Sequence, residues 1–380
     1  MLEKDTSDFI FSLTQNEAIA HIMRDWLEVA SGKPILLGAG IKGRETLAAL
    51  RQSGLHPCCF ADDTASKHGT SIDGLPVRSV EEALNGLTDR PIVIVCIFTP
   101  GHQFKNIAKR VRALRSDALV IPFFTALLAT QDRNFENYFL SHPEHEVKRL
   151  PIYRELYDKL TDSSSRIVLL EHLRLRLMHD TSIGMTPRSI TPFPATLFRN
   201  RELSYVDGGA FDGDTVEEFI QLHEGCFREI HAVEPDSLNL ERLQNRFNHL
   251  PNEIRQKILI HPMGLWRESC HLGFAADGTM GSRIELKSSK KIAVTSLDSI
   301  LTSVSSPVLI KLDLEGAEME ALAGAVNVTK RIRPAWAVSA YHRPSDLISI
   351  FGWLEASGQD YSYALRCHGG DGADLMFYAY

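Results

Sequence analysis

The chain has 380 residues, of which 44% are hydrophobic and 23% are charged, and its formal net charge is −7. This length allows two domains, and the composition is that of a globular protein. The negative charge argues against nucleic acid as the main partner. No apolar run approaches the ~18 residues that a membrane-spanning helix needs.

Cysteine usage and the first residues both point to a cytoplasmic protein. The six cysteines show no Cys-x-x-Cys spacing, so they predict free thiols in a reducing compartment rather than disulfides or a zinc site. The first residues are charged and contain no apolar core typical of a signal peptide.

Strands and helices are predicted to alternate in the first third of the chain. Helical apolar spacing predicts a first helix over residues 16–30. Alternation from residue 34 onward indicates parallel strands joined by crossover helices. The predicted strands are 35–37, 57–61, 92–98 and 119–122, and the predicted helices are 42–53, 80–87 and 103–114.

A glycine-rich turn, with Gly38, Gly40 and Gly43, follows the first of these strands and opens a helix. This is the context that a dinucleotide-binding fingerprint requires. Asp62 and Asp63 follow the next strand, where a ribose-binding acid is expected. These residues are candidates for a second nucleotide site. The alternative is that the glycines serve only the packing of helix on strand.

The same region carries a wider pattern. Its pieces, within about residues 33–122, are Phe60-Ala61-Asp62-Asp63, Gly69 and Ile72-Asp73-Gly74-Leu75-Pro76-Val77. They resemble the N-terminal domain of sugar-nucleotide acyltransferases and of polysaccharide-biosynthesis dehydratases. The resemblance implies a Rossmann-like domain over residues 1–130 that holds a nucleotide or a nucleotide sugar.

Residues 131–200 are predicted to form a helical connector and linker. Helices are expected at 135–140, 152–160 and 166–179. Residues 181–200 carry three prolines and no periodicity, which predicts an irregular loop before a second domain at 201–380.

The second domain opens with a strand, small residues, a helix and another strand. The first strand ends in Asp207, which Gly208, Gly209 and Ala210 follow, and the second strand ends at Glu234. This pattern is typical of the nucleotide half-site of an open α/β sheet, with Glu234 placed to accept both ribose hydroxyls. Because no pyrophosphate-type glycine loop is present, adenosine without phosphates fits better. A methyltransferase that uses S-adenosylmethionine needs this arrangement.

Further cofactor candidates lie nearby. Asp212 and Gly213 continue the loop, with helix capping as the alternative role of Asp212. Met263 and Gly264 follow the third strand, where an adenine would lie, and core packing is the alternative for Met263. Lys311 lies on the fourth strand, and a structural ion pair is its alternative.

Candidates for the chemistry follow the fourth and fifth strands. Methyl transfer to a hydroxyl requires a base near the acceptor, or a metal ion that lowers the pKa of the acceptor. Asp313 is predicted to act as base, metal ligand or acceptor orienter. His342 is the second catalytic candidate, with a structural role as its alternative. If a divalent metal takes part, Asp313 and Glu315 are its expected ligands. Glu318 and Glu320 are expected on an exposed helix face.

Strands and helices are also predicted to alternate through the second domain. The predicted strands are 203–207, 229–234, 257–261, 308–312, 335–340, 361–366 and 374–380, and the predicted helices are 214–223, 237–248, 317–326 and 345–356. The turn-rich connection at 367–372 predicts that the last two strands form an antiparallel hairpin. Residues 270–294 are an extra segment, expected to form a β-excursion over the site.

Several pieces of this domain together carry a family resemblance. They are Val206-Asp207-Gly208-Gly209-Ala210, Val233-Glu234-Pro235, Thr295-Ser296-Leu297-Asp298, Ile310-Lys311-Leu312-Asp313-Leu314-Glu315-Gly316-Ala317-Glu318, and the tail after Ala340-Tyr341-His342. In this order they resemble the FkbM family of S-adenosylmethionine-dependent methyltransferases over about residues 203–380. The resemblance implies a seven-stranded class I methyltransferase sheet and a hydroxyl acceptor on a sugar, a glycan precursor or a secondary metabolite. The predicted fold class is α/β with two Rossmann-like domains.

Two other interpretations compete with a methyltransferase. In the first, the methyltransferase fold is inactive and the protein binds nucleotide sugars or acts as a scaffold, against which the intact Asp207, Glu234 and Asp313 argue. In the second, the glycine turn at residues 38–43 serves an NAD-dependent enzyme, although no hydride-transfer partner is evident.

Overall fold

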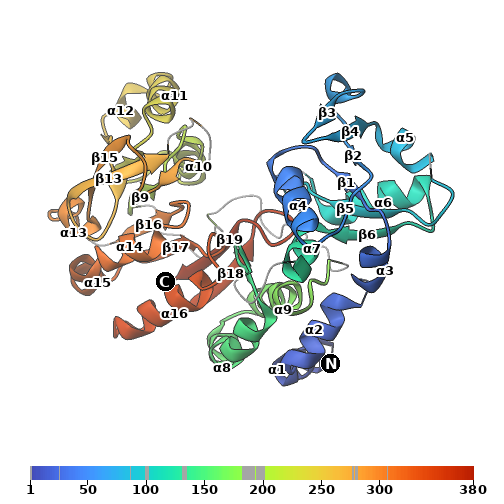
Figure 1. Ribbon diagram of the computed structural model, residues 1–380. Coiled ribbons are helices and arrows are strands. Elements are labelled where there is room, and N and C mark those ends of the chain that lie inside the picture. The colour runs from blue at the N-terminus through green and yellow to red at the C-terminus, as the bar shows by residue number, and fades with distance from the viewer. Residues whose placement is uncertain are drawn as a thin grey trace. The chain divides into compact units, whose positions relative to one another are not determined.

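A computed structural model describes residues 2–24, 26–85, 87–98, 102–130, 135–181, 193, 202–275, 278, 281–305 and 307–380. The chain divides into two compact units (Figure 1). Unit 1 comprises residues 1–154, 167–186 and 369–373, and unit 2 comprises residues 155–166, 187–368 and 374–380. Each unit therefore takes residues from separate stretches of the sequence.

Unit 1 contains a sheet whose described strands are ordered β3-β4-β2-β1-β5-β6. The strands are β1 (Ile35–Leu37), β2 (Cys59–Ala61), β3 (Ser71–Ile72), β4 (Leu75–Arg78), β5 (Ile92–Val95) and β6 (Leu119–Pro122). All pairs are parallel except β3 with β4. The strands β1 and β5 are apolar and buried at every position, as parallel strands covered on both faces require.

Helices alternate with β1, β2, β5 and β6, as predicted for residues 34–122. They are α4 (Ile41–Gln52), α5 (Val80–Asn85), α6 (Phe104–Leu114) and α7 (Phe123–Thr130). The antiparallel pair of β3 and β4, between β2 and α5, was not predicted. The single helix predicted at 16–30 is wrong in extent. The structure has α1 (Leu2–Ser12), α2 (Gln15–Met23) and α3 (Trp26–Ser31), and a capping box of Thr14 and Glu17 starts α2.

The segment after α7 departs from its prediction at one point. It contains β7 (Glu136–Asn137), β8 (Leu140–Ser141), α8 (Pro143–Lys159) and α9 (Ser163–Met178). The helix predicted at 135–140 is wrong: β7 and β8 form a hairpin, and Tyr138 between them has a φ of +51°, which a right-handed helix does not allow. The helices predicted at 152–160 and 166–179 are present within α8 and α9. The loop predicted at 181–200 lies almost wholly outside the described residues.

Unit 2 is built on a sheet of seven strands among the described residues, ordered β11-β10-β9-β16-β17-β19-β18. The strands are β9 (Ser204–Gly208), β10 (Ile230–Val233), β11 (Ile258–His261), β16 (Val308–Leu312), β17 (Ala335–Ser339), β18 (Tyr363–Cys367) and β19 (Leu375–Ala379). From β11 to β17 the neighbours are parallel, whereas β19 is antiparallel to both β17 and β18. The order reverses between β9 and β16, and ligands of open α/β sheets bind beyond the carboxyl ends of strands at such a switch point.

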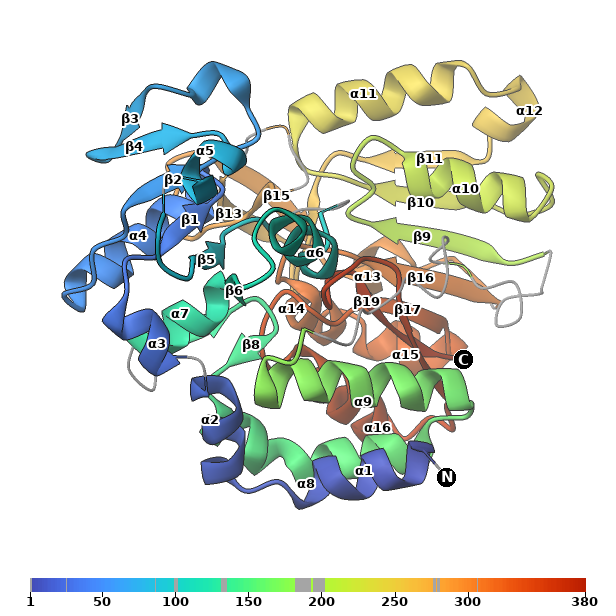
Figure 2. The same cartoon turned by 90° about the vertical axis from the view of Figure 1, so that its right-hand side faces the viewer.

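Helices connect the strands of unit 2. They are α10 (Asp214–Leu222), α11 (Ser237–Asn248), α12 (Asn252–Arg255), α13 (Leu297–Ile300), α14 (Glu318–Ala323), α15 (Val326–Ile332) and α16 (Asp346–Ala356). Figure 2 shows α10 and α11 beside β9, β10 and β11. Phe219 of α10 and Leu243 and Phe247 of α11 are buried in the core of this unit. The one helix predicted at 317–326 is instead the pair α14 and α15, which meet at Gly324 and Ala325.

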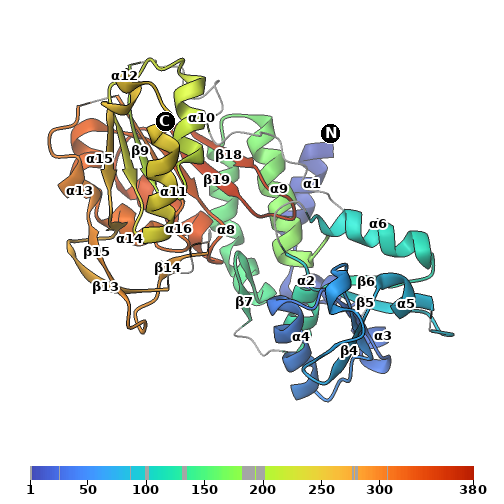
Figure 3. The same ribbon diagram turned by 90° about the horizontal axis from the view of Figure 1, so that it is seen from above.

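The extra segment between β11 and β16 forms a second, smaller sheet, which confirms the predicted β-excursion (Figure 3). Its order is β12-β15-β13-β14, with β12 (Gly264–Leu265), β13 (Cys270–Ala275), β14 (Arg283–Ile284) and β15 (Lys291–Thr295). Phe274, Ile292 and Val294 form its core.

Two further predictions concern the whole chain. All six cysteines are free thiols, as expected. Within the described part of the chain, no helix has the length and apolar character needed to cross a membrane. The cytoplasmic location stays a prediction.

Candidate functional site

Two buried charges of opposite sign meet at the switch point of unit 2. Asp207 on β9 is paired in register with Lys311 on β16, and Lys311 Nζ lies 3.0 Å from Asp207 Oδ1. The hydroxyl of Thr215 donates to Asp207 Oδ2 at 2.5 Å. Burial alone would lower the pKa of Lys311, but the attraction of Asp207 and Asp313 raises it, so the ammonium keeps its charge. Both carboxylate oxygens of Asp207 are thus bonded within the protein.

The loop after β9 is folded tightly against the loop after β16. Gly209 has a φ of +77°, and a Cβ at this position would lie 1.9 Å from the carbonyl oxygen of Asp313. The amide of Asp313 donates to the carbonyl of Gly208 at 3.0 Å. The amides of Gly209 and Ala210 both donate to the carbonyl of Val233, at 3.0 and 3.1 Å. These contacts join the carboxyl ends of β9, β10 and β16.

Glu234, at the end of β10, is only 5% exposed. Its Oε2 accepts from the amide of Phe211 at 3.0 Å, and its Oε1 accepts from the amide of Asp236 at 2.8 Å and from Asn239 Nδ2 at 3.5 Å. Burial raises the pKa of Glu234 to about 7, although these hydrogen bonds oppose the shift. The carboxylate therefore lies beside the glycine loop in a site that water reaches poorly.

The remaining cofactor candidates surround this loop. Asp212 Oδ2 lies 2.6 Å from Arg246 Nη2, so its carboxylate is engaged in an ion pair. Gly213 is the N-cap of α10 and has a φ of +87°, which favours glycine. Met263 is half-buried after β11, and Gly264 begins β12 in a buried position.

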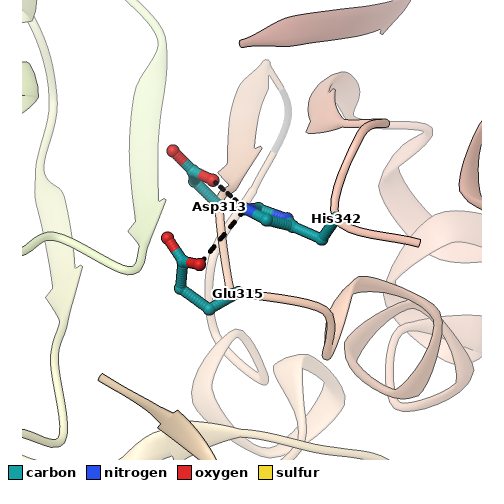
Figure 4. Close-up of side chains that lie close together, drawn as sticks. All are labelled: Asp313, Glu315 and His342. Carbon is teal, nitrogen blue, oxygen red and sulfur yellow. Dashed lines mark ion pairs between the residues drawn. The ribbon is translucent and has the colours of Figure 1, made fainter. Parts of the chain in front are cut away.

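Asp313, Glu315 and His342 come together at the ends of β16 and β17 (Figure 4). His342 Nε2 lies 3.6 Å from Asp313 Oδ1 and 3.6 Å from Glu315 Oε2. The His342 side chain is 4% exposed, whereas those of Asp313 and Glu315 are 33% and 27% exposed. The structure thus brings the two catalytic candidates and the second candidate metal ligand into one cluster, which we call the Asp313 cluster.

Glu318 contacts the Asp313 cluster, and the sequence analysis placed it wrongly. It is fully buried rather than exposed, and its Oε1 lies 2.9 Å from His342 Nδ1. The same oxygen accepts from the amides of Leu314 and Gly316, at 2.8 and 3.3 Å. Glu320 is also not an exposed residue, since its side chain is 23% exposed and forms an ion pair. Because His342 lies 24 positions after Glu318, no local spacing reveals their contact.

Further buried acids lie near His342 that the sequence analysis missed. Asp346 lies at the start of α16. Ligand atoms of Asp346, Glu318 and His342 lie within 4.8 Å of one another. Burial and the charge of Glu318 raise the pKa of Asp346 to about 7. Burial also raises the pKa of Asp374. Burial alone would lower the pKa of His342, but the carboxylates around it, Glu318 first, raise it well above its usual value.

The excursion is attached beside Glu234. Asp236, the N-cap of α11, accepts from Ser282 Oγ at 2.7 Å and from the amide of Gly278 at 3.2 Å. Arg283, the first residue of β14, is exposed. The excursion loop therefore lies next to the predicted ribose site.

The candidates for a second nucleotide site belong to unit 1. Asp62 accepts from the amide of Ala39 at 2.8 Å, from Lys67 Nζ at 2.9 Å and from the amide of Thr64 at 2.9 Å. Burial alone would raise the pKa of Asp62, but these bonds lower it to about 2. Both oxygens of the acid predicted to bind a ribose are therefore engaged within unit 1, and one of them holds the glycine turn through Ala39.

The three glycines of this turn differ in surroundings. A Cβ at Gly43 would lie 2.0 Å from the carbonyl oxygen of Gly38, which itself has a φ of +109°. Among the described residues, no atom lies within 4 Å of a Cβ placed at Gly40. Asp63 is exposed and pairs with Arg110 at 2.8 Å. The structure thus explains why residues 38 and 43 are glycines. It gives no such reason for Gly40, which faces open space among the described residues.

Comparison with known proteins identifies part of the chain. Residues 207–363 match the methyltransferase FkbM domain. The FkbM domain match begins at Asp207 and extends past His342, so it contains all the unit 2 candidates named above. No curated protein matches the sequence significantly.

One of the solved structures that resemble this chain is similar along its whole length. Methyltransferase FkbM from Methylobacillus flagellatus KT is similar with a TM-score of 0.76 at 22% identity, over 100% of this chain and 98% of that chain. This likeness shows that the two chains share a fold. Precorrin-6y C5,15-methyltransferase from Geobacter metallireducens GS-15 has a TM-score of 0.29 at 12% identity, over 47% of this chain and 80% of that chain. Aeropyrum pernix fibrillarin has a TM-score of 0.28 at 12% identity, over 47% of this chain and 68% of that chain.

Proposed function

We propose that unit 2 transfers a methyl group from S-adenosylmethionine to a hydroxyl of a sugar, a glycan precursor or a secondary metabolite. The observation that carries this proposal is the position of Glu234, a buried acid at the end of β10 that is bonded to the glycine loop of the neighbouring strand. The match to the methyltransferase FkbM domain over residues 207–363 supports it.

The residues present fit the adenosine part of this cofactor. A carboxylate offers about four acceptor positions, and Glu234 uses two for short bonds to amides and one for the 3.5 Å contact with Asn239. A ribose hydroxyl can therefore still donate to it. Met263 and Gly264 follow the adjacent strand, where they would contact the adenine.

The methionine part would lie over the loop that follows Asp207. Gly208, Gly209 and Ala210 leave room for it, and the ion pair of Asp207 with Lys311 holds this loop in place. Asp212 contributes through its ion pair, which fixes the loop before α10.

The cofactor supplies a methyl group on a positively charged sulfur that leaves as a neutral thioether. The acceptor oxygen forms a bond to the methyl carbon, the carbon–sulfur bond breaks with its electron pair on sulfur, and the hydroxyl loses its proton. Asp313 lies at the switch point with a partly exposed carboxylate, so we assign it to accept that proton or orient the hydroxyl. His342, held by Glu318, lies beside Asp313, and we assign it to the same acceptor end of the site as the second catalytic candidate.

Titration calorimetry with S-adenosylhomocysteine tests the cofactor site. Glu234→Ala should weaken binding by about 1.5–3 kcal/mol, the scale of hydrogen bonds to a charged group. Glu241→Ala, at an exposed glutamate of α11, is the matched control and should bind as the original protein does. Equal affinity of all three proteins would remove Glu234 from the site.

The reaction itself is followed as S-adenosylhomocysteine released with candidate hydroxyl acceptors. Asp313→Asn should keep cofactor binding and lose about 100-fold or more in turnover, the usual contribution of a general base. Cofactor binding without turnover on any acceptor would favour the inactive scaffold instead.

For unit 1 we propose a nucleotide sugar as the ligand, approaching the glycine turn at Gly40. The open space at Gly40 supports this, whereas the engaged carboxylate of Asp62 removes the expected ribose contact. An NAD-dependent activity has no additional support in the described residues of this unit.

A further inference from the structure

We propose that Asp313, Glu315 and His342 bind one divalent metal ion, with Glu318 as the residue that orients the histidine. The inference concerns the Asp313 cluster, and only its catalytic consequence rests on the proposed function. Three features of the cluster support it: the fixed orientation of His342, the spacing of three ligand atoms, and the excess of negative charge.

A carboxylate that contacts Nδ1 fixes the orientation of the His342 ring. Its Nδ1 lies 2.9 Å from Oε1 of Glu318, which is fully buried and is itself held by the amides of Leu314 and Gly316. A ring nitrogen bonded to a carboxylate carries a proton and donates it, so Nε2 is the nitrogen left for a cation, which would displace any proton held there. Histidines that bind metals are oriented by carboxylates in this way.

The free nitrogen points between two carboxylates (Figure 4). His342 Nε2 is 3.6 Å from Asp313 Oδ1 and 3.6 Å from Glu315 Oε2, which is too long for hydrogen bonds. Nε2 of His342 and Oδ1 of Asp313 are both buried and have no hydrogen-bond partner among the described residues. Buried polar atoms normally have partners, so this convergence requires an explanation.

A metal ion at the centre of the cluster satisfies these atoms together. Two ligand atoms that each lie about 2.1 Å from one cation are separated by about 3 Å at a right angle and about 4 Å when opposite. The observed separations of 3.6 Å fall between these limits, and all three ligand atoms lie within 4.8 Å of one another.

The local charge favours a divalent cation. Asp313, Glu315 and Glu318 all approach one imidazole, and Asp346 lies within ligand distance of two of these groups. Two carboxylates and one imidazole are hard and intermediate ligands, a set that suits Mn²⁺ among the first-row metals. No thiol lies in the group of ligand atoms identified among the described residues.

The cluster also leaves room for a further ligand. The side chains of Asp313 and Glu315 are 33% and 27% exposed, so the cation would have coordination positions open on that side. The amide of Asp313 is bonded to Gly208 in the predicted cofactor loop. If the proposed function holds, a hydroxyl that coordinates the cation would have its pKa lowered beside the methyl donor.

Manganese itself is the probe for this site. The full chain is treated with a chelator, desalted and titrated with Mn²⁺, and the electron paramagnetic resonance signal of free Mn²⁺ is measured. We expect one bound Mn²⁺ per chain, and loss of this binding in Asp313→Asn and in His342→Ala. Glu318→Gln should weaken binding by about 10- to 100-fold, the usual effect of removing such a second partner.

Control variants separate the metal site from folding and from cofactor binding. His271→Ala, at an exposed histidine of β13, should bind Mn²⁺ as the original protein does. Each variant is also titrated with S-adenosylhomocysteine, and unchanged affinity shows that unit 2 is folded. Binding of S-adenosylhomocysteine without any binding of Mn²⁺ would overturn the metal site and leave the proposed function standing. Equal Mn²⁺ binding by the cluster variants and by the original protein would also overturn it.

Discussion

The buried ion pair of Asp207 and Lys311 makes single residues of unit 2 unusually sensitive to substitution. Lys311→Met would leave the carboxylate of Asp207 buried without its counter-charge, although the hydroxyl of Thr215 would still donate to it. Removal of one partner of a buried ion pair typically lowers the free energy of unfolding by about 3–5 kcal/mol. Urea denaturation should therefore show a loss of this size in the free energy of unfolding.

An exposed ion pair provides the comparison for this prediction. Arg110 lies 2.8 Å from Asp63 in unit 1, with both side chains about half exposed, so Arg110→Met should change the stability very little. The double variant Lys311→Met with Asp207→Asn should recover part of the loss, because the unpaired charge is gone. A loss in Lys311→Met no larger than that in Arg110→Met would contradict this account.

The raised pKa of Glu234 predicts a link between protons and cofactor binding. Since burial raises this pKa from 4.5 to about 7, the carboxyl is partly protonated at pH 6.5. Ribose hydroxyls donate to the ionised form, so binding of S-adenosylhomocysteine should release a fraction of a proton at pH 6.5. The affinity should rise as the pH increases through 7.

Calorimetry in two buffers that differ in ionisation enthalpy measures this proton release. Glu234→Gln should abolish it. The sign for folding is opposite: because the folded pKa exceeds the unfolded one, the contribution of Glu234 to stability is lost as the pH rises from 4.5 to about 7. An affinity independent of pH in this range would show that Glu234 does not contact the cofactor.

Single residues at the candidate site were predictable only where they follow a strand. Asp313 and His342 were found because parallel strands place their carboxyl ends at one edge. Glu318 was missed because it is the first residue of α14, a position usually exposed, and its burial depends on His342, which the chain reaches 24 positions later. Long-range contacts of this kind leave no periodic pattern in the sequence.

At the level of elements, the long strands and helices were predicted and the shortest ones were not. Strands such as β5 and β16 are buried along their whole length, and they appear as apolar runs, unbroken in β5 and interrupted only by Lys311 in β16. The hairpin of β7 and β8 has strands of two residues each, too short for a period-2 pattern. Its aromatic residues, Phe135, Tyr138 and Phe139, have the i, i+3, i+4 spacing that also predicts a helix. The separation of α14 from α15 at Gly324 likewise depends on tertiary contacts, since a Cβ there would lie 2.3 Å from the carbonyl oxygen of Trp266.

The contact between the loops after β9 and β16 predicts the effect of one methyl group. Gly209→Ala places a Cβ 1.9 Å from the carbonyl oxygen of Asp313, at a φ of +77°. Strain and overpacking together should lower the free energy of unfolding by about 2–5 kcal/mol. Cofactor binding should fall as well, because the loop must move away from β16.

Gly358 is a matched control for this substitution. It has a φ of +69°, and no atom lies within 4 Å of a Cβ placed there. Gly358→Ala should therefore cost only the strain of the left-handed conformation, about 1–2 kcal/mol. If urea denaturation gives equal losses for both variants, the close approach of the two loops does not contribute to stability.

The whole molecule contains two units, each with a core of its own. The core around Leu37 and Val93 belongs to unit 1, and the core around Tyr205 and Phe219 belongs to unit 2. The predicted division at residues 130 and 200 follows sequence composition, whereas both units draw on residues near 160 and 370. The stretches that join a unit from elsewhere in the sequence do so through tertiary contacts, and composition carries no sign of such contacts.

Two ligands should therefore protect different parts of the chain. In hydrogen exchange followed by mass spectrometry, S-adenosylhomocysteine should slow exchange at residues 207–213 and 234–239, and UDP-glucose should slow it at residues 38–43. Gly40→Val should remove only the second effect. If UDP-glucose leaves unit 1 unprotected, the glycine turn has a structural role alone.

The position of β19 has a consequence for how this protein is made. It is the last of the strands in sequence, yet it lies between β17 and β18 in the sheet. On the ribosome, β17 and β18 are therefore synthesised before the strand that joins them. The nascent sheet keeps an unpaired edge, of the kind that aggregates, until residues 375–379 have emerged. Unit 2 can complete its folding only after residues 375–379 have emerged, and until then the exposed edge of β17 is open to pairing with other chains.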